Sequence, residues 1–452
     1  MPIAPARKIA FEILLRVEKE SAYASELLYA RLDQRLNARD AALATELVMG
    51  ALRRQGELDF FIERYAQKPA IALDAEPRIA LRMGIYQLRR LSRIPAHAAV
   101  SESVELVKCS RKESASSLVN AILRRAAGEK TRPIEQFLSA DIPLAQRLSI
   151  THSHPAWLIE RWLARFGESR TQALLESNNA PPASACAISE PESREQIIRS
   201  LEAAGVKTEP GRLARNALII TGGNVQKTKA FRDGSLSFQD EASQLIPLLL
   251  EVRPGASVLD LCAAPGGKTL ALARAAGPSS LVVAADLHEH RLRAMRARLK
   301  INGAAHVHLL ALDATIALPF RNQFGRILVD APCSGTGTLA RNPEIRWRLK
   351  PSDLADLHRR QVLLLISALA CLARRGRLVY STCSLEPEEN EQVLTEALSA
   401  HPEFRLIPAQ LPADAFAPGI SPSQLIAPDG IFRTFPPDHH SDAFFAAAFD
   451  RR

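Results

Sequence analysis

The chain has 452 residues, which at roughly 150 residues per domain suggests about three domains. Hydrophobic residues make up 47% and charged residues 24%, ordinary globular values that exclude a chain disordered throughout. The 58 lysines and arginines exceed the 49 aspartates and glutamates, so the net charge is +9, which is compatible with a polyanionic partner but does not establish one. Six cysteines without C-x-x-C spacing argue against a disulfide framework or a zinc ribbon.

Targeting and membrane signals are weak in this sequence. Glu12 interrupts the apolar run near the N-terminus and no small-residue cleavage site follows, so we expect no signal peptide. The longest apolar run, 362–373, is too short to cross a bilayer and predicts a buried helix. We therefore expect a cytoplasmic, monomeric protein with reduced thiols and with neither a membrane partner nor a metal ion.

Residues 1–130 predict an all-α bundle. Ala10, Ile13, Leu14 and Val17 follow the i, i+3, i+4, i+7 spacing of a helix that buries one apolar stripe. The same pattern predicts helices over 40–54, 58–66, 77–91 and 101–125. Basic pairs on these helices fit either solvated faces or a surface that tracks phosphates; they stand at 53–54, 89–90, 111–112 and 124–125.

Beyond residue 130 the pattern changes twice. Residues 131–170 predict a helical connector, and residues 171–235 a small α+β module with a helix over 193–204 and a strand over 217–221. Residues 236–452 predict a Rossmann-like α/β domain with a largely parallel sheet, because strand-like runs alternate with helical segments. Those strands are expected at 257–261, 281–286, 306–311, 326–330 and 376–381.

Acidic residues stand at or just beyond the ends of most of these strands, at Asp260, Asp286, Asp313 and Asp330. Ligands of an open α/β sheet bind outside the carboxyl ends of its strands. We therefore expect these four carboxylates to share one crevice.

The loop after strand 257–261 predicts a nucleoside cofactor. Its small residues let a ligand approach the backbone, and the helix that follows offers unpaired N–H groups. Asp286, about 20 residues on, is placed to bind ribose hydroxyls. The loop is neither a P-loop nor G-x-G-x-x-G, which leaves NAD, S-adenosylmethionine and an empty Rossmann-like turn open. The loop residues assigned to the cofactor are Cys262, Ala263, Ala264, Pro265, Gly266, Gly267 and Lys268.

Two later loops carry cysteines among serines, threonines and glycines. Cys333 follows strand 326–330 closely after Asp330, and Cys383 follows strand 376–381. Most cysteines in a chain of this kind are small buried hydrophobes. That role is expected for Cys109, Cys186 and Cys371.

Three blocks, DLCAAPGGKT, DAPCSGTGTLARNPEIRW and YSTCSLEPEENEQV, resemble the motifs of RNA cytosine-C5 methyltransferases of the NOL1/NOP2/Sun family. Residues 1–130 resemble the NusB-type helical RNA-binding domain of bacterial members that act on the small subunit. Ser153-His154-Pro155-Ala156-Trp157 and residues 239–243 resemble further stretches of those proteins. The resemblance covers essentially the whole chain, and it implies S-adenosylmethionine as cofactor and 16S ribosomal RNA as substrate.

The resemblance also implies residue roles. Carbon 5 of cytosine takes a methyl group only after a thiolate has added to carbon 6, which needs an activated cysteine. By resemblance Cys383 is that nucleophile, Cys333 assists elimination and release, and Asp330 bonds the base edge beside the cofactor. Asp313 matches a position that contacts the cofactor's adenine. Lys268 matches a loop lysine that meets the cofactor or a phosphate, although a helix-surface cation fits it as well.

Other features leave alternatives open. Arg341, Asn342, Glu344 and Trp347 fit either the RNA cleft or a structural helix start after Pro343. The sequence departs from the family at 183–189, which lacks an Arg-x-Asn pair that contacts RNA, and at Ala443, where a glycine is common.

Other functional classes fit the motifs less well. An NAD-linked oxidoreductase has no role for the paired cysteines, and a non-catalytic RNA-binding factor does not need the intact motifs around them. An amino-directed methylase is expected to carry an Asn/Asp-Pro-Pro-aromatic loop, and residues 330–333 are not one. A DNA cytosine methylase takes its nucleophile from the Pro-Cys loop and has no need of the second cysteine motif at 381–383.

Overall fold

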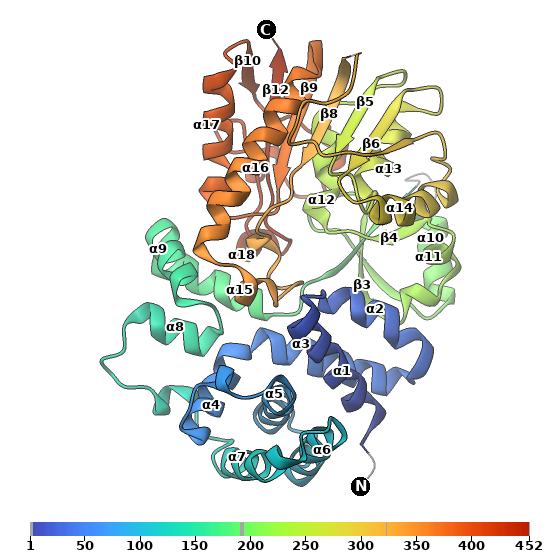
Figure 1. Ribbon diagram of the computed structural model, residues 1–452. Coiled ribbons are helices and arrows are strands. Elements are labelled where there is room, and N and C mark those ends of the chain that lie inside the picture. Colours follow the sequence, from blue (N-terminus) through green and yellow to red (C-terminus); the bar gives the residue numbers. More distant parts are fainter. Residues whose placement is uncertain (1–2, 190–193, 322, 452) are drawn as a thin grey trace. The chain divides into compact units, whose positions relative to one another are not determined.

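The computed structural model describes residues 3–189, 194–321 and 323–451. Its contacts divide the chain into two compact units (Figure 1). Met1–Pro181 and Leu339–Arg348 form the first, which we call the helical unit, and Pro182–Thr338 and Leu349–Arg452 form the second, the sheet unit. The short segment 339–348 thus belongs to the helical unit, although the chain on both sides of it belongs to the sheet unit. Among the described residues, no helix is both long and apolar enough to span a bilayer.

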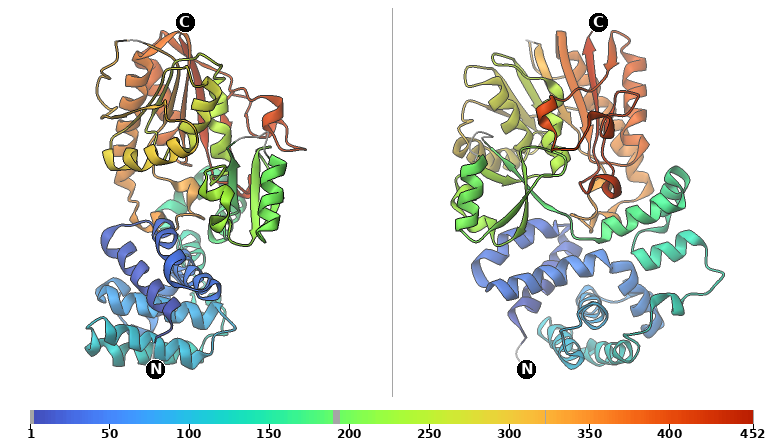
Figure 2. Two further views of the ribbon diagram at one scale, coloured as in Figure 1. Left: turned by 90° about the vertical axis from the view of Figure 1, so that its right-hand side faces the viewer. Right: turned by 180° about the vertical axis from the view of Figure 1, so that it is seen from behind.

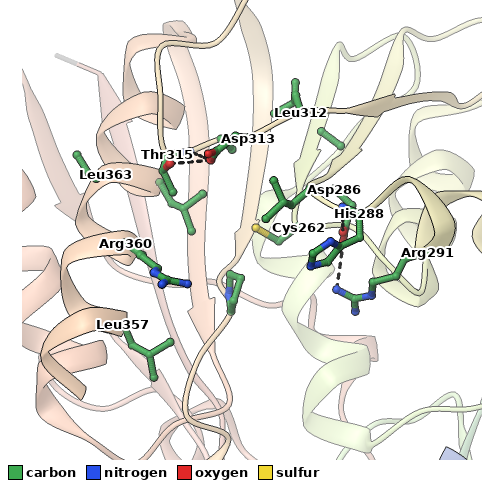
Figure 3. A pocket seen from close by; sticks show the side chains of 15 residues that line it. Cys262, Asp286, His288, Arg291, Leu312, Asp313, Thr315, Leu357, Arg360 and Leu363 are labelled. Atoms are coloured by element: carbon green, nitrogen blue, oxygen red, sulfur yellow. Dashed lines mark hydrogen bonds and ion pairs between the residues drawn. The ribbon is translucent and has the colours of Figure 1, made fainter. Parts of the chain in front are cut away.

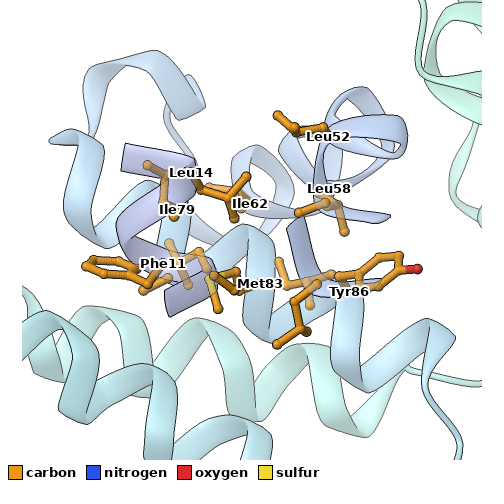
Figure 4. Close-up of a cluster of buried hydrophobic side chains, with 14 of the residues drawn as sticks. Phe11, Leu14, Leu52, Leu58, Ile62, Ile79, Met83 and Tyr86 are labelled. Carbon is orange, nitrogen blue, oxygen red and sulfur yellow. The ribbon is translucent and has the colours of Figure 1, made fainter. Parts of the chain in front are cut away.

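The helical unit is built from amphipathic helices that bury their apolar stripes against one another. Ile62 and Met83 are fully buried in one cluster with Leu58 and Ile79 (Figure 4). The all-α fold predicted for 1–130 is confirmed. The helices are α1 (Pro5–Glu20), α2 (Ala24–Arg35), α3 (Ala38–Arg53), α4 (Gln55–Ala66), α5 (Ala75–Arg90), α6 (Ala96–Cys109), α7 (Ser116–Gly128), α8 (Leu144–His152), α9 (Ala156–Asn179) and α15 (Ile345–Arg348).

Some expectations for this unit are wrong. The single helix expected over 101–125 is two, because α6 ends at Cys109 and Arg111 takes a left-handed φ of 60° before α7 begins. Not every basic pair is a solvated face, since Arg53 is 8% exposed and the guanidinium of Arg89 lies 4.1 Å from the ring centre of Phe61. Cys109 is exposed rather than buried.

The sheet unit begins with the predicted small α+β module. Its four strands run in the order β2-β3-β1-β4, and every neighbouring pair is antiparallel. Apolar side chains of the sheet, such as Cys186 and Leu218, pack with Leu201 of the helix, so the module has a core of its own. Position 193, where the helix was expected to start, lies outside the described residues. The elements are β1 (Ser184–Ile188), α10 (Arg194–Ala203), β2 (Lys207–Pro210), β3 (Ala217–Gly222), α11 (Lys229–Arg232) and β4 (Leu236–Phe238).

The larger sheet has the order β10-β12-β9-β8-β5-β6-β7, with β11 paired to β12. The neighbours from β9 through β7 are parallel, as predicted, whereas β12 is antiparallel to β9, β10 and β11. The strands are β5 (Val258–Leu261), β6 (Val282–Asp286), β7 (His308–Ala311), β8 (Phe324–Asp330), β9 (Leu372–Thr382), β10 (Phe404–Ile407), β11 (Phe432–Arg433) and β12 (Phe445–Arg451).

Helices cover both faces of this sheet, and alternation along the strands decides which residue faces which layer. Val258 and Leu328 pack in a cluster with α13 (Gly267–Ala276) and α14 (Glu289–Ile301). Their sequence neighbours Leu259 and Ile327 pack in another cluster with α16 (Pro351–Ala370) and α17 (Glu391–Ala400). Figure 2 shows these layers from two further sides. The parallel strands therefore end at one edge, between two helical layers.

Candidate active site

The predicted site residues stand on loops at that common edge. Strand β5 lies between β6 and β8 in the sheet. The chain runs from β5 through β6 and β7 on one side and then crosses back to β8 on the other side. The crossovers therefore diverge at β5, and a crevice opens outside the carboxyl ends of strands at such a point.

The loop between β5 and α13 brings backbone close to this crevice. Gly266, the residue before α13, has a φ of 97°, and a Cβ there would lie 2.7 Å from Cγ of Met295, so both conformation and space require glycine. The N–H of Ala264 donates to Oδ2 of Asp286 at 3.2 Å, which ties the loop to the end of β6. Burial raises the pKa of the Cys262 thiol, so this cysteine stays protonated and unreactive.

A pocket of about 370 Å³ lies beside this loop (Figure 3). Cys262, Asp286 and Asp313 line it, with Leu363 of α16 among the apolar side chains opposite. Asp286 is 4% exposed and also accepts the N–H of His288 at 3.0 Å. Asp313 accepts bonds from the N–H and the hydroxyl of Thr315 at 2.9 and 2.6 Å. A second pocket, of about 100 Å³, is lined by Asp330 and by further residues of the cofactor loop. These loop residues are Ala263, Ala264, Pro265, Gly267 and Lys268.

The structure brings the two predicted cysteines together. Sγ of Cys333 lies 3.1 Å from Sγ of Cys383, and the N–H of Cys383 donates to Sγ of Cys333 at 3.3 Å. The hydrogen bond with Cys383, burial and the nearby negative charge together raise the pKa of Cys333 well above its ordinary value. Cys333 is therefore the sulfur of the pair that keeps its proton.

Lys268 and Asp330 form an ion pair beside the thiols. Nζ of Lys268 lies 2.6 Å from Oδ2 of Asp330, while Oδ1 of Asp330 accepts the hydroxyl of Ser381 at 2.8 Å. Burial opposes the charge on Lys268, but the ion pair and hydrogen bond with Asp330 and the interaction with Cys383 raise its pKa above the ordinary value. Lys268 therefore lies in the site and is not a helix-surface cation.

Glu389 was not assigned a role from the sequence, although it lies in the third motif block. It is fully buried, and its Oε1 accepts the N–H of Ser334 at 2.7 Å and the side chain of Gln361 at 3.0 Å. Its Oε2 accepts the hydroxyls of both Ser334 and Ser384. Because these serines follow the two cysteines directly, one carboxylate joins the two cysteine loops. In the sequence, a glutamate in a Glu-rich motif predicts an exposed side chain, so the pattern does not identify Glu389 as buried.

Asp260 lies beneath the site. It is 1% exposed, accepts the hydroxyl of Thr269, and has an Oδ1 for which no hydrogen-bond partner is found. Burial raises its pKa to about 7; the charge of Asp330 adds to the shift and the Thr269 hydrogen bond opposes it. Among the described residues, no cluster of histidine, cysteine and acidic side chains has the arrangement of a metal site.

Segment 341–347 makes packing contacts within the helical unit. It belongs to the helical unit, where Oε1 of Glu344 accepts the N–H of Ala24 at 2.9 Å and the Trp347 ring lies against Gly56. These contacts fit the structural interpretation of the two that the sequence left open.

The fold and the site define a Rossmann-like domain with a nucleoside-sized pocket and a pair of adjacent thiols at one edge of its sheet. The model of the 16S rRNA methyltransferase RsmB/F family matches residues 247–450, the NusB family matches 4–128, and an RsmF/B-like ferredoxin-like domain matches 154–226. The chain belongs to the family of bacterial ribosomal RNA small subunit methyltransferase B.

Two relatives and one solved structure illustrate this membership. The chain is 33% identical to the probable ribosomal RNA small subunit methyltransferase B of Bacillus subtilis, over 88% of this chain and 89% of the relative. It is 35% identical to the ribosomal RNA small subunit methyltransferase B of Pseudomonas putida, over 88% and 90%. A crystal structure of a methyltransferase homologue from Pyrococcus horikoshii is similar with a TM-score of 0.58 and 27% identity, covering 69% of this chain and all of that chain. The protein is a methyltransferase, which removes the oxidoreductase alternative.

The raised pKa of Asp260 predicts a pH-dependent stability. In the unfolded chain the carboxyl has an ordinary pKa of about 3.9, so between about pH 4 and pH 7 only the folded state holds the proton. This contribution stabilises the fold at low pH and is lost as the pH rises through 7. The free energy of unfolding of wild type minus that of Asp260→Asn should fall across this window by up to about 1.4 kcal/mol per pH unit. Urea titrations at several pH values measure it, and a difference independent of pH would contradict the assignment.

Glu389→Gln should destabilise the protein, because a single amide oxygen replaces an acceptor of four donors and its NH₂ faces the serine hydroxyls. We expect a loss of about 1–3 kcal/mol in the free energy of unfolding. Glu289→Gln is the matched control: its exposed ion pair with Arg293 should cost less than about 1 kcal/mol. Denaturant unfolding compares the two variants, and equal losses would mean that Glu389 does not join the cysteine loops.

Proposed function

We propose that this protein transfers a methyl group from S-adenosylmethionine to carbon 5 of a cytosine in 16S ribosomal RNA, through a covalent bond between Cys383 and carbon 6. The single observation that carries the proposal is the distance of 3.1 Å between the sulfurs of Cys383 and Cys333. A methyl transfer to oxygen or nitrogen needs no such pair of thiols, whereas methylation of carbon 5 needs a nucleophile and a group that assists its release.

The reaction needs four changes at the base. Cys383 adds to carbon 6, so the 5,6 double bond becomes an enamine whose carbon 5 is nucleophilic. Carbon 5 then takes the methyl group from the sulfonium centre, and S-adenosylhomocysteine is left as product. Loss of the carbon-5 proton and breakage of the bond from Cys383 to carbon 6 restore the double bond. Cys333 acts in this last stage: its thiol gives its proton to the departing sulfur of Cys383, and its own sulfur takes the carbon-5 proton.

The electrostatics support this division of roles. Cys333 keeps its proton because its pKa is raised well above the ordinary value, so it acts as a donor to its neighbour. The ammonium of Lys268 interacts electrostatically with Cys383 instead, and this interaction contributes to the raised pKa of Lys268. A cation beside a cysteine is the usual way to favour the nucleophilic thiolate.

Asp330 is suited to bind the base edge. Its carboxylate is held by Lys268 and Ser381, yet a carboxylate has about four acceptor sites and these contacts use two. A remaining site can accept the exocyclic amine of cytosine. The partly exposed Asp330 side chain also borders the smaller pocket, next to the cofactor loop.

The larger pocket fits S-adenosylmethionine. Asp286 already accepts the N–H groups of Ala264 and His288 and pairs with Arg291, and its remaining acceptor capacity at the end of β6 is available to the ribose. Asp313 lines the pocket near apolar side chains that suit an adenine ring. When bound, this cofactor supplies an activated methyl group. The loop residues Cys262 to Lys268 hold the backbone close to it, and Asp286 and Asp313 orient it.

The substrate assignment comes from the relatives. Several are called ribosomal RNA small subunit methyltransferase B, and the NusB match over 4–128 agrees with the predicted RNA-binding bundle. A net charge of +9 favours a polyanionic partner whose binding weakens with salt.

We further propose the functional division into 1–130, 131–170, 171–235 and 236–452.

Asp286→Ala should weaken binding of S-adenosylmethionine about tenfold to a hundredfold, since a charged acceptor of two hydroxyls is worth about 1.5–3 kcal/mol. Isothermal titration calorimetry on the full chain measures the effect. Glu20→Ala, which removes an exposed carboxylate on α1, is the control and should leave the affinity unchanged. Binding of NADH without binding of S-adenosylmethionine would overturn the cofactor assignment.

The two cysteines should respond differently to the same substitution. Cys383→Ala leaves carbon 5 unactivated, so neither methyl transfer nor a covalent protein–RNA species should form. Cys333→Ala still allows attack and methyl transfer but stalls release, so an adduct that resists denaturant should accumulate on a denaturing gel. The double variant should behave like Cys383→Ala.

The opposite pattern, an adduct with Cys383→Ala and none with Cys333→Ala, would mean that the roles are reversed. Activity equal to wild type in both single variants would exclude the covalent mechanism.

A further inference from the structure

Arg346 in α15 is one of the largest fully buried side chains, with no exposed surface. Its Nη1 donates to Oδ1 of Asn179 at 2.8 Å and to the carbonyl of Ser153 at 3.1 Å, with the carbonyl of Arg53 at 3.5 Å. Its Nη2 donates to the carbonyls of Asn178 and Leu339 at 3.1 and 3.2 Å. These acceptors are all uncharged and all belong to the helical unit. Backbone carbonyls therefore accept most of the hydrogen bonds that the buried guanidinium donates.

The surroundings of Arg346 are themselves fixed by hydrogen bonds. The side-chain amide of Asn178 donates to Nε2 of His154 at 3.2 Å, so the proton of this buried histidine is on Nδ1, which donates to the carbonyl of His152 at 2.8 Å. Nδ1 is therefore no acceptor for Arg346, although it lies 3.4 Å away. Two motifs noted in the sequence, at 153–154 and 343–347, thus meet here with Asn178 and Asn179.

Further bonds hold segment 339–348 in the same unit. Arg53 donates to the carbonyl of Ala340 at 2.9 Å, and Arg348 donates to the carbonyls of Val17 and Ala22 at 2.8 and 2.7 Å. Leu339, whose carbonyl accepts a hydrogen bond from Arg346, has no exposed surface. The first residues after the Cys333 loop are therefore anchored in the helical unit.

The other end of the Cys333 loop is fixed on the second cysteine. The N–H of Gly337 donates to the carbonyl of Cys383 at 3.0 Å, and a Cβ on Gly337 would lie 2.8 Å from that oxygen. Only Thr338 separates Gly337 from Leu339. The two residue steps from Gly337 to Leu339 span at most about 7 Å. A displacement of Leu339 is therefore passed on to the hydrogen bond between Gly337 and Cys383.

We propose that Arg346 is a positioning residue for the paired thiols: by anchoring Leu339 in the helical unit it holds the 333–338 loop, and with it Cys333, against Cys383. The kinetic part of this inference rests on the proposed methyl transfer, whereas the position of Cys333 is measurable without it.

The test compares Arg346→Lys with Arg78→Lys in the full chain. A lysine keeps the charge at 346 but cannot reach acceptors on both sides of a guanidinium. Arg78 is the matched control, because it is also buried in the helical unit and donates to the carbonyls of Ala70, Ile71 and Leu73 without touching segment 339–348.

Arg346→Lys should lower kcat for methyl transfer to rRNA about tenfold to a hundredfold, the usual effect of misplacing a catalytic group by about 1 Å. The Kd for S-adenosylmethionine should stay unchanged. Iodoacetamide should alkylate Cys333 faster than in wild type, as followed by mass spectrometry of its peptide. Arg78→Lys should lower the melting temperature without changing kcat or the alkylation rate.

An equal loss of kcat in both variants at equal loss of stability would overturn the proposal, as would unchanged kcat and alkylation in Arg346→Lys. If Arg346→Lys does not fold, Asn179→Ala removes the shortest of the bonds to Arg346 and should give smaller changes of the same sign; no change at all would overturn the proposal. If wild type transfers no methyl group to rRNA, the proposed function fails, and faster alkylation of Cys333 in Arg346→Lys still supports the positioning role.

Discussion

Parallel pairing between β8 and β9 determines where both thiols lie. Asp330 at the end of β8 is in register with Ser381 on β9, and the N–H of Ala331 donates to the carbonyl of Ser381 at 2.8 Å. From this pair of residues the segments that follow β8 and β9 leave the sheet side by side, and each reaches its cysteine within three residues. A shift of one residue in this register would turn each side chain to the other face of the sheet and separate the pair.

Buried polar bonds then fix what the sheet brings together. In a low-dielectric interior a charge without partners is costly, so each functional group here is accompanied by another that satisfies it. Lys268 pairs with Asp330 at the thiols, and Glu389 joins the loops that carry them. Arg346 extends this principle into the helical unit, where the chain leaves the sheet unit for ten residues and returns. Several hydrogen bonds and an ion pair therefore hold the loops that carry the two thiols.

Much of the fold follows from patterns that the sequence displays. The period of apolar residues predicts the helices of 1–130, and strand-like runs ending in acids predict β5, β6 and β8 with the loops that follow them. The motif blocks predict which residues share the site edge. Glu389 and Arg346 were not predicted, because a charged residue that is buried cannot be told from an exposed one until its partners, distant in the chain, are known. The break at Arg111 was missed for a similar reason, since neither proline nor glycine marks it.

The most direct test of the central claim is the modification state of 16S rRNA in cells. Bisulfite sequencing and nucleoside mass spectrometry compare a strain that lacks this gene with the same strain carrying the gene again. We expect one 5-methylcytosine of 16S rRNA to vanish with the gene and to return with it, while all other methylated nucleosides stay at their wild-type levels. An unchanged 5-methylcytosine content, or the loss of a nucleoside methylated at another atom, would contradict the account.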